Sequence, residues 1–242
     1  MKTKITLLSF LFIVFVVVFA SPSRNWSKNP ILHQSSKCSV KKLTFGGGDV
    51  FIIKIFKGKM NYKVDTKNEG NFDFYLNSNF FTNTNPIGEV MVDGKTINKK
   101  VTKGGYFTSN GNNPTITLYD RPTSLYSTQT KYIGIKNGVL NKSMFKSKLS
   151  KWKTYRTLLG KDKDGNLILI HSGKSGLVSV EDISLMGKSE GMVNALIFDG
   201  GSSIEVLVKD GNYKHNYHSV SDDTKRRLKI HKPFSYITGK FI

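Results

Sequence analysis

The sequence contains a single cysteine, Cys38, so no disulfide can form within the chain. It also shows no long helical periodicity, no internal repeat and no proline- or serine-rich linker within its main part. These absences exclude a disulfide-stapled scaffold, a helical bundle and a string of linked modules. An apolar core must therefore stabilise the fold. Cys38 is expected as a lone thiol, with pairing between molecules as the alternative.

The sequence also lacks a recognisable set of metal ligands. Its five histidines are scattered and no cysteine cluster accompanies them. We therefore expect no metal and no other cofactor from the sequence.

Acidic residues are scarce, with 17 Asp and Glu against 37 Lys and Arg, which gives a formal net charge of +20. A surface this basic attracts polyanions, such as anionic glycans, phosphorylated sugars or nucleic acid. The lysines are spread along the chain, so the charge alone does not identify a partner. The alternative to polyanion binding is a general bias toward lysine that favours solubility. No nucleic-acid-binding motif is present, and nucleic acid is not expected as a partner.

The N-terminus has the pattern of a secretion signal. Two lysines precede an apolar run, and Val18 and Ala20 suit a signal peptidase site before Ser21. The run is about 14–16 residues long, short of the roughly 20 that span a bilayer. We expect residues 1–20 to be removed and the protein to be secreted or periplasmic, without stable membrane insertion. An uncleaved signal anchor is the alternative.

The rest of the chain predicts one α+β domain that is rich in strands and has few helices. Residues 21–48 are polar and glycine-containing, and are expected to be a flexible N-terminal segment. From residue 49 to 242, short apolar runs alternate with turn signals such as Asp93-Gly94 and Asn137-Gly138. One good helix is expected over 179–191, where Ser179 and Asp182 have the spacing of a capping box.

The most informative stretch, residues 194–208, reads NALIFDGGSSIEVLV. The apolar run predicts a buried strand that ends at Asp199. Gly200 and Gly201 permit a sharp turn and a close approach of a ligand. The backbone N–H groups of residues 200–203, with the hydroxyls of Ser202 and Ser203, could bind an anion beside the carboxylate. A plain hairpin turn with an Asx-type bond is the alternative.

Two other stretches carry polar groups suited to a sugar phosphate. Asn79 could hydrogen-bond a sugar, and Phe80 or Phe81 could stack on it, although an ordinary loop has the same composition. Arg156 could hold a phosphate with two hydrogen bonds, with a surface ion pair as the alternative.

Taken in order, these blocks resemble the phosphodiester glycosidases, the family of the mannose-6-phosphate uncovering enzyme, N-acetylglucosamine-1-phosphodiester α-N-acetylglucosaminidase. The resemblance runs from about residue 50 to the end, and its most specific part is FDGGSS. The matching positions fall in three blocks: Asn79, Phe81, Pro86, Gly88 and Gly94; Arg156, Thr157, Gly160, Asp164 and Gly165; Ala195, Asp199, Gly200, Gly201 and Ser203. Ser202 stands where family members often have a third glycine.

The resemblance implies cleavage of the bond between an anomeric carbon and a phosphodiester oxygen, in an N-acetylglucosamine-type sugar or within an anionic glycan. Asp199 would act as nucleophile or general base, Arg156 would hold the phosphate and Asn79 would orient the sugar. Glu181 is the candidate second carboxylate, with a solvent-facing helix position as the alternative. The remaining residues are expected to bind substrate: Phe81, Thr157, Gly200, Gly201, Ser202, Ser203 and His171. For His171, which could carry a proton, an ordinary strand-end histidine is the alternative.

A second hypothesis is a secreted basic module that binds anionic glycan or nucleic acid without catalysis. Its aromatic and basic residues are interleaved, as in some nucleic-acid-binding proteins. Such a module would not depend on Asp199. The sequence leaves the oligomeric state open.

Overall fold

The computed structural model describes residues 26–82, 85–120, 123–220 and 233–242. The expected signal peptide, residues 1–20, lies outside the described residues. Within them, no helix is long and apolar enough to cross a membrane.

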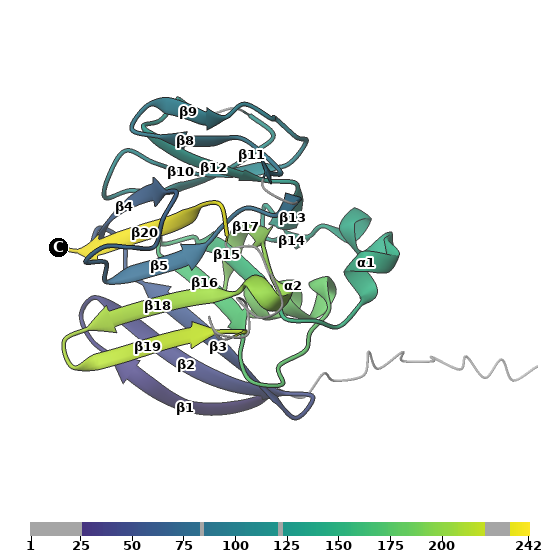
Figure 1. Cartoon of the computed structure of the whole chain (residues 1–242). Coiled ribbons are helices and arrows are strands. Elements are labelled where there is room, and N and C mark those ends of the chain that lie inside the picture. The colour runs from purple at the N-terminus through teal and green to yellow at the C-terminus, as the bar shows by residue number, and fades with distance from the viewer. Residues whose placement is uncertain (1–25, 83–84, 121–122, 221–232) are drawn as a thin grey trace, which may run out of the picture.

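Three antiparallel sheets and one two-stranded ribbon make up the described fold (Figure 1). The eight-stranded sheet has, in spatial order, β1 (Ser27–Gln34), β2 (Cys38–Phe45), β3 (Gly48–Ile55), β16 (Leu167–Ser172), β15 (Thr157–Asp162), β17 (Met192–Phe198), β13 (Tyr132–Lys136) and β14 (Val139–Leu140). One five-stranded sheet has β11 (Thr115–Leu118), β10 (Gly105–Ser109), β12 (Tyr126–Thr130), β8 (Val90–Val92) and β9 (Lys95–Asn98). The other has β19 (Tyr213–His218), β18 (Glu205–Asp210), β5 (Phe74–Asn77), β20 (Tyr236–Phe241) and β4 (Met60–Asp65). The ribbon pairs β6 (Phe81–Thr82) with β7 (Asn85–Pro86).

Helical structure is sparse in the described part of the chain. It consists of α1 (Lys148–Lys151), α2 (Val180–Ser189) and the short 3-10 turns η1 (Lys142–Lys146) and η2 (Gly201–Ser203). The prediction of a strand-rich fold with few helices is confirmed. Because the fold is mostly β, the α+β class describes it only loosely.

The predicted local signals are present. Asp93 and Gly94 have φ values of 48° and 74°, and Asn137 and Gly138 have 50° and 74°, as tight hairpin turns require. At the start of α2, Ser179 accepts from the N–H of Asp182 while Asp182 accepts from the N–H of Ser179. This reciprocal capping box satisfies two backbone donors that would otherwise lack acceptors.

The prediction of a flexible segment over 21–48 is wrong for residues 27–45. They form β1 and β2, and β2 pairs with β3 in unbroken register from Cys38–Ile55 to Phe45–Gly48. Three consecutive residues of β2, Cys38, Ser39 and Val40, are buried. The polar residues of this segment therefore belong to the outer strands of a sheet, and the globular fold begins well before residue 49.

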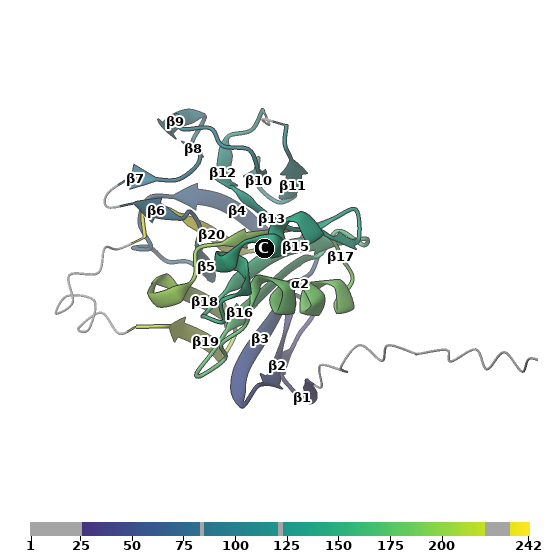
Figure 2. The same ribbon diagram turned by 90° about the vertical axis from the view of Figure 1, so that its right-hand side faces the viewer.

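Strand β17 is buried on both faces. Leu196 and Phe198 pack into the core between the sheets, whereas Ala195 and Ile197 pack into a second core beneath α2. Figure 2 shows α2 beside β16 and β17. A strand that is covered on both sides reads as a continuous apolar run, which explains the sequence ALIF before Asp199.

Candidate functional site

Asp199 lies where the chain leaves one sheet for another. It follows β17 of the eight-stranded sheet, and the next strand, β18, belongs to a five-stranded sheet. The N–H of Asp199 donates to the carbonyl oxygen of Ser78 at 3.1 Å. Its side chain is buried, and Oδ1 accepts from the N–H of Gly200 at 2.9 Å. The loop is therefore a link between sheets rather than a hairpin turn.

The two glycines let this loop pack against the start of β15. A Cβ at position 200 would lie 2.4 Å from the carbonyl oxygen of Tyr155 and 3.3 Å from the Cα of Arg156. Gly201 has φ +64° and donates to Tyr155 O at 2.9 Å. Position 200 thus requires glycine for space, and position 201 favours glycine for its conformation.

We expected the backbone N–H groups of residues 200–203 to bind an anion, but three of them already have acceptors within the protein. The N–H groups of Gly200, Gly201 and Ser203 donate to Asp199 Oδ1, Tyr155 O and Gly200 O, respectively. Ser202 is exposed, whereas Ser203 is buried. The backbone N–H groups at 200, 201 and 203 therefore stabilise the loop and are not directed at a ligand.

Arg156 lies beside the Asp199 loop because Thr157 pairs with Phe198 in the β15–β17 ladder. Its guanidinium is buried and donates through Nη2 to Trp152 O at 3.1 Å. Burial lowers the pKa of Arg156, which nearby Tyr132 partly offsets. A cation with little water around it attracts an anion more strongly than an exposed one does. Because Arg156 is buried, the alternative of a plain surface ion pair does not fit this residue.

Arg156 lines a small cavity of about 30 Å³. Phe80 and Tyr132, which also line it, meet edge to face with ring centroids 5.1 Å apart. The other lining residues are Met144, Ser147, Ser150, Val180 and Ile197. The side chain of Phe81, the aromatic that we predicted to bind substrate, lies outside what the structure describes.

Asn79 is held on all sides by protein groups. Its Oδ1 accepts from the hydroxyls of Ser78 (3.0 Å), Ser235 (2.7 Å) and Thr128, and its Nδ2 donates to Gln129 O at 2.9 Å. The residue is buried, so the expected direct contact with a sugar does not match its surroundings. It fixes Ser78, whose carbonyl oxygen holds Asp199.

Thr157 and His171 face the side of the sheet opposite to Arg156. They pair across β15 and β16, and side chains alternate between faces along a strand. Both are fully buried, and Thr157 Oγ1 has no hydrogen-bond partner among the described residues. The structure therefore does not bring these two predicted substrate-binding residues together with Arg156.

His171 is a core histidine. Its Nδ1 lies 3.0 Å from Ser172 O and its Nε2 lies 2.9 Å from Nε2 of His215. Burial, together with His215, lowers the pKa of His171 to about 3, and burial lowers that of His215 to about 4. The ring is neutral near pH 7 and is enclosed, so the alternative of an ordinary histidine at the end of a strand fits His171 better than a proton carrier does.

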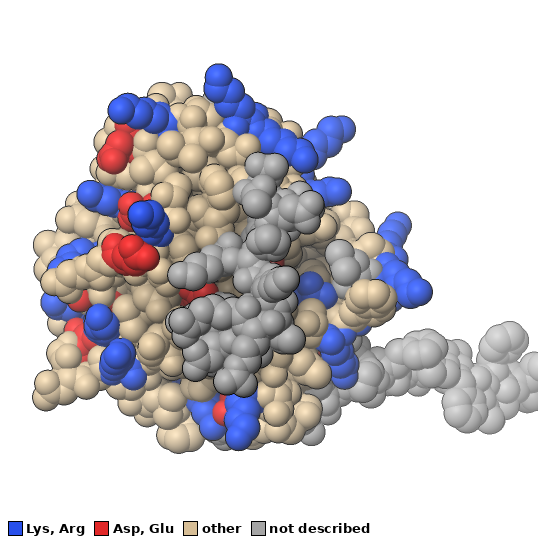
Figure 3. All heavy atoms as spheres, viewed as in Figure 1, with Lys and Arg blue, Asp and Glu red and all other residues tan. Residues whose placement is uncertain are grey.

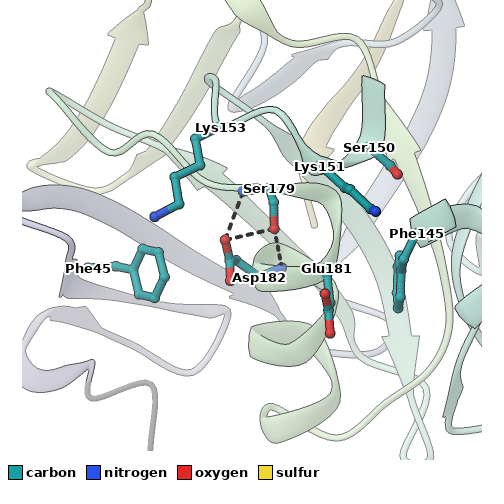
Figure 4. Close-up of a pocket in the computed structure, with 8 residues that line it drawn as sticks. All are labelled: Phe45, Phe145, Ser150, Lys151, Lys153, Ser179, Glu181 and Asp182. Atoms are coloured by element: carbon teal, nitrogen blue, oxygen red, sulfur yellow. Dashed lines mark hydrogen bonds between the residues drawn. The ribbon is translucent and has the colours of Figure 1, made fainter. Parts of the chain in front are cut away.

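Glu181 lines a second, larger cavity of about 330 Å³ at the start of α2. Figure 4 shows Lys153 and Lys151 on either side of the Ser179–Asp182 capping box, and both line this cavity. The remaining lining residues are Phe45, Phe145 and Ser150. Ser150 also lines the cavity of Arg156, so the two cavities adjoin. Sequence analysis missed Lys151 and Lys153 as part of this site because nothing local distinguishes them from the other lysines.

Metal-ligating side chains do not gather at this site in the described part of the chain. Among the described residues, one group of three such side chains lies close enough together to share a cation. It consists of His33, Cys38 and Asp210. The sequence expectation of no metal constellation did not foresee this group.

Comparisons with known proteins agree on the fold. The catalytic domain of zebrafish N-acetylglucosamine-1-phosphodiester α-N-acetylglucosaminidase, auto-inhibited by its pro-peptide, superposes with a TM-score of 0.61 at 13% identity, over 88% of this chain and 86% of that chain. A hypothetical protein from Synechocystis gives a TM-score of 0.61 at 14% identity; the match covers 88% of this chain but only 64% of that one. A comparison with curated protein sequences found no significant match.

The family comparison is more specific. Residues 65–231 match the family model described as phosphodiester glycosidase. This stretch covers more than half of the chain and includes Asn79, Arg156 and the Asp199 loop. The chain belongs to the phosphodiester glycosidase family.

Proposed function

We propose that this protein is an exported hydrolase that cleaves the glycosidic bond of a sugar 1-phosphodiester. An N-acetylglucosamine-type sugar is the proposed glycone, free or within an anionic glycan. The observation that carries the proposal is the placement of Asp199, a buried carboxylate at the junction of two sheets, next to Gly200, which packs against the backbone of Tyr155 and Arg156. Family membership supports the reaction class. Export rests on the leader-like residues 1–20.

One well-placed carboxylate suits this chemistry. Many glycosidases need a second carboxyl group to protonate the leaving oxygen. A phosphodiester leaves as a weak base and needs less protonation. Asp199 then acts on the anomeric carbon as a nucleophile, or as a base toward water. Glu181, on the wall of the adjoining cavity, is the proposed second carboxylate where proton transfer is required.

Side-chain cations hold the phosphate in this proposal. Arg156 offers a poorly hydrated guanidinium beside the Asp199 loop, and Lys151 and Lys153 line the larger cavity. That cavity, at about 330 Å³, falls within the range of small-molecule sites, whereas the cavity of Arg156 admits only water-sized groups. The hydroxyls of Ser202 and Ser203 are further proposed donors. Asn79 is proposed to position Asp199 rather than to touch the sugar.

The first test is release of free sugar from an α-N-acetylglucosaminyl 1-phosphodiester by the purified protein. Asp199→Asn should lower turnover about a hundredfold or more, because it removes the reacting carboxylate but little volume. Asp164→Asn, the same change at an exposed turn, is the matched control and should retain activity. Circular dichroism of both variants checks the fold.

The alternative is a basic module that binds anionic glycan without turnover. Figure 3 shows Lys and Arg side chains around the whole outline of one face rather than in one patch, so the charge marks no single docking site there. A binding module would keep its affinity for anions in Asp199→Asn and release no sugar in either form. That pair of results would overturn the proposed hydrolase.

A further inference from the structure

Three different metal-ligating side chains meet far from the Asp199 loop. His33 comes from β1, Cys38 from β2 and Asp210 from the end of β18. His33 Nε2 lies 2.8 Å from Asp210 Oδ2, and Cys38 Sγ lies 3.6 Å from the same oxygen. All three ligand atoms fall within 4.8 Å of one another.

These separations are close to those of a shared tetrahedral cation. Zinc–ligand bonds of about 2.0–2.3 Å at tetrahedral angles place a sulfur and an oxygen about 3.6 Å apart, and a nitrogen and an oxygen about 3.3 Å apart. The sulfur–oxygen distance already matches. The nitrogen–oxygen distance needs to open by only about half an ångström, which side-chain rotation can supply.

The surroundings hold the three groups in place. The imidazole of His33 stacks on the ring of Tyr213, with centroids 4.4 Å apart and planes 9° from parallel. The N–H of Cys38 donates to Ser35 Oγ at 3.1 Å, and the N–H of Ser35 donates to Cys38 O at 3.0 Å. The Cys38 residue is fully buried, whereas the side chains of His33 and Asp210 keep 18% and 11% exposure. A cation could therefore enter from the histidine and aspartate side, with water as a fourth ligand.

We propose that His33, Cys38 and Asp210 bind a divalent transition-metal ion of the zinc class. Imidazole, thiolate and carboxylate together suit Zn²⁺ or Co²⁺. Calcium and magnesium prefer sites made entirely of oxygen, which this one is not.

The position of the site gives the ion a structural role. It would join the β1–β2 hairpin of the eight-stranded sheet to β18 of a five-stranded sheet. His33 and Asp210 are 177 residues apart, so the ion would close a long loop of chain. Asp210 lies at the end of β18 away from the Asp199 loop, five residues and about 17 Å beyond Glu205. The ion is therefore separate from the proposed sugar chemistry.

The competing arrangement is a cation-free hydrogen-bonded group. Without a cation, the Cys38 thiol donates a hydrogen bond to Asp210 Oδ2 at 3.6 Å, and His33 Nε2 lies 2.8 Å from the same oxygen. Binding of the ion replaces the thiol proton, which passes to the solvent while a metal–sulfur bond forms.

The test is titration of the purified protein with Co²⁺ and then Zn²⁺. We expect one equivalent of Co²⁺ to produce thiolate-to-metal charge-transfer absorption, which Zn²⁺ then abolishes, and a higher melting temperature with either ion. Cys38→Ser should remove the absorption, and His33→Asn and Asp210→Asn should each weaken Zn²⁺ binding at least about tenfold. His218→Asn, the same change on β19 outside the group, is the control and should bind as the native protein does.

Two results would overturn the site. One is the absence of charge-transfer absorption and of any melting shift in the native protein. The other is Zn²⁺ binding that persists at native strength in His33→Asn and Asp210→Asn. If Cys38→Ser does not fold, the His33 and Asp210 variants decide, because neither side chain is fully enclosed.

Discussion

The backbone N–H of Asp199 donates to the carbonyl oxygen of Ser78 at 3.1 Å, and this bond joins the end of β17 to the chain just after β5. The two strands belong to different sheets. Asp199 is therefore fixed by the meeting of the sheets and not by its own loop alone. Changes on either side of this junction should move the carboxylate.

Gly200→Ala should disturb the junction from the loop side. The new Cβ would lie 2.4 Å from Tyr155 O, so the backbone must shift at a cost of about 1–3 kcal/mol in the free energy of unfolding. Gly211→Ala is the control, because it strains a positive φ of 58° in open space and costs about 1–2 kcal/mol. Urea unfolding and sugar release are measured for both. Both variants should lose stability, but only Gly200→Ala should lose most of its turnover; equal turnover would contradict the assigned role of the loop.

Asn79→Ala should disturb the junction from the β5 side. It removes the acceptor of three buried hydroxyls and the donor to Gln129 O, and we expect a loss of about 2–4 kcal/mol in unfolding free energy. Asn61→Ala, at an exposed position on β4, should change stability by less than about 0.5 kcal/mol. If Asn79 positions Asp199, kcat should fall while KM stays near the native value. A raised KM with an unchanged kcat would instead indicate direct sugar contact.

Arg156→Met should weaken the handling of the phosphate. We expect kcat/KM to fall about tenfold to a thousandfold, because a charge-assisted contact to the phosphodiester is lost. Lys99→Met removes one exposed positive charge and controls for general attraction of an anionic substrate. Its kcat/KM should change by less than about threefold at moderate salt. Similar losses in both variants would show that Arg156 acts only through overall charge.

The buried histidine pair should make the fold sensitive to acid. In the folded protein the pKa values of His171 and His215 are about 3 and about 4, below the value of about 6.5 in an unfolded chain. As the pH falls below about 6.5, the unfolded chain takes up protons first, so stability decreases toward pH 4 by up to about 1.4 kcal/mol per pH unit for each histidine. Above pH 7 the pair should have no effect on the pH dependence.

Urea unfolding at pH 7.5 and pH 5 measures this dependence. The double variant His171→Leu/His215→Leu should lose less stability between the two pH values than the native protein loses. An equal loss in both would mean that other groups cause the acid sensitivity.

Local sequence signals predicted the parts of the fold that depend on neighbouring residues. The turns at Asp93-Gly94 and Asn137-Gly138 and the capping box at Ser179 follow from backbone preferences within four residues. The Asp199 loop was found in the same way, because its glycines are adjacent to the carboxylate.

Long-range pairing could not be predicted. Nothing in residues 38–45 indicates that they pair with β3, and nothing in residues 27–34 indicates that they pair with β2. The surroundings of Asn79 depend on Thr128 and Ser235, which are 49 and 156 residues away in the sequence. His33, Cys38 and Asp210 are also far apart in the sequence. The scattered histidines and the single cysteine therefore indicated no metal site, although the fold brings these three side chains together.

In the proposed reaction, the protein breaks the bond between the anomeric carbon and oxygen, and not a phosphorus–oxygen bond. Hydrolysis of an α-N-acetylglucosaminyl 1-phosphodiester in ¹⁸O-labelled water distinguishes the two, because the attacked atom receives the label. We predict ¹⁸O at the anomeric hydroxyl of the released sugar, an unlabelled phosphomonoester, and loss of both products in Asp199→Asn. Label in the phosphate, or sugar release that persists in Asp199→Asn, would contradict cleavage at the anomeric carbon by Asp199.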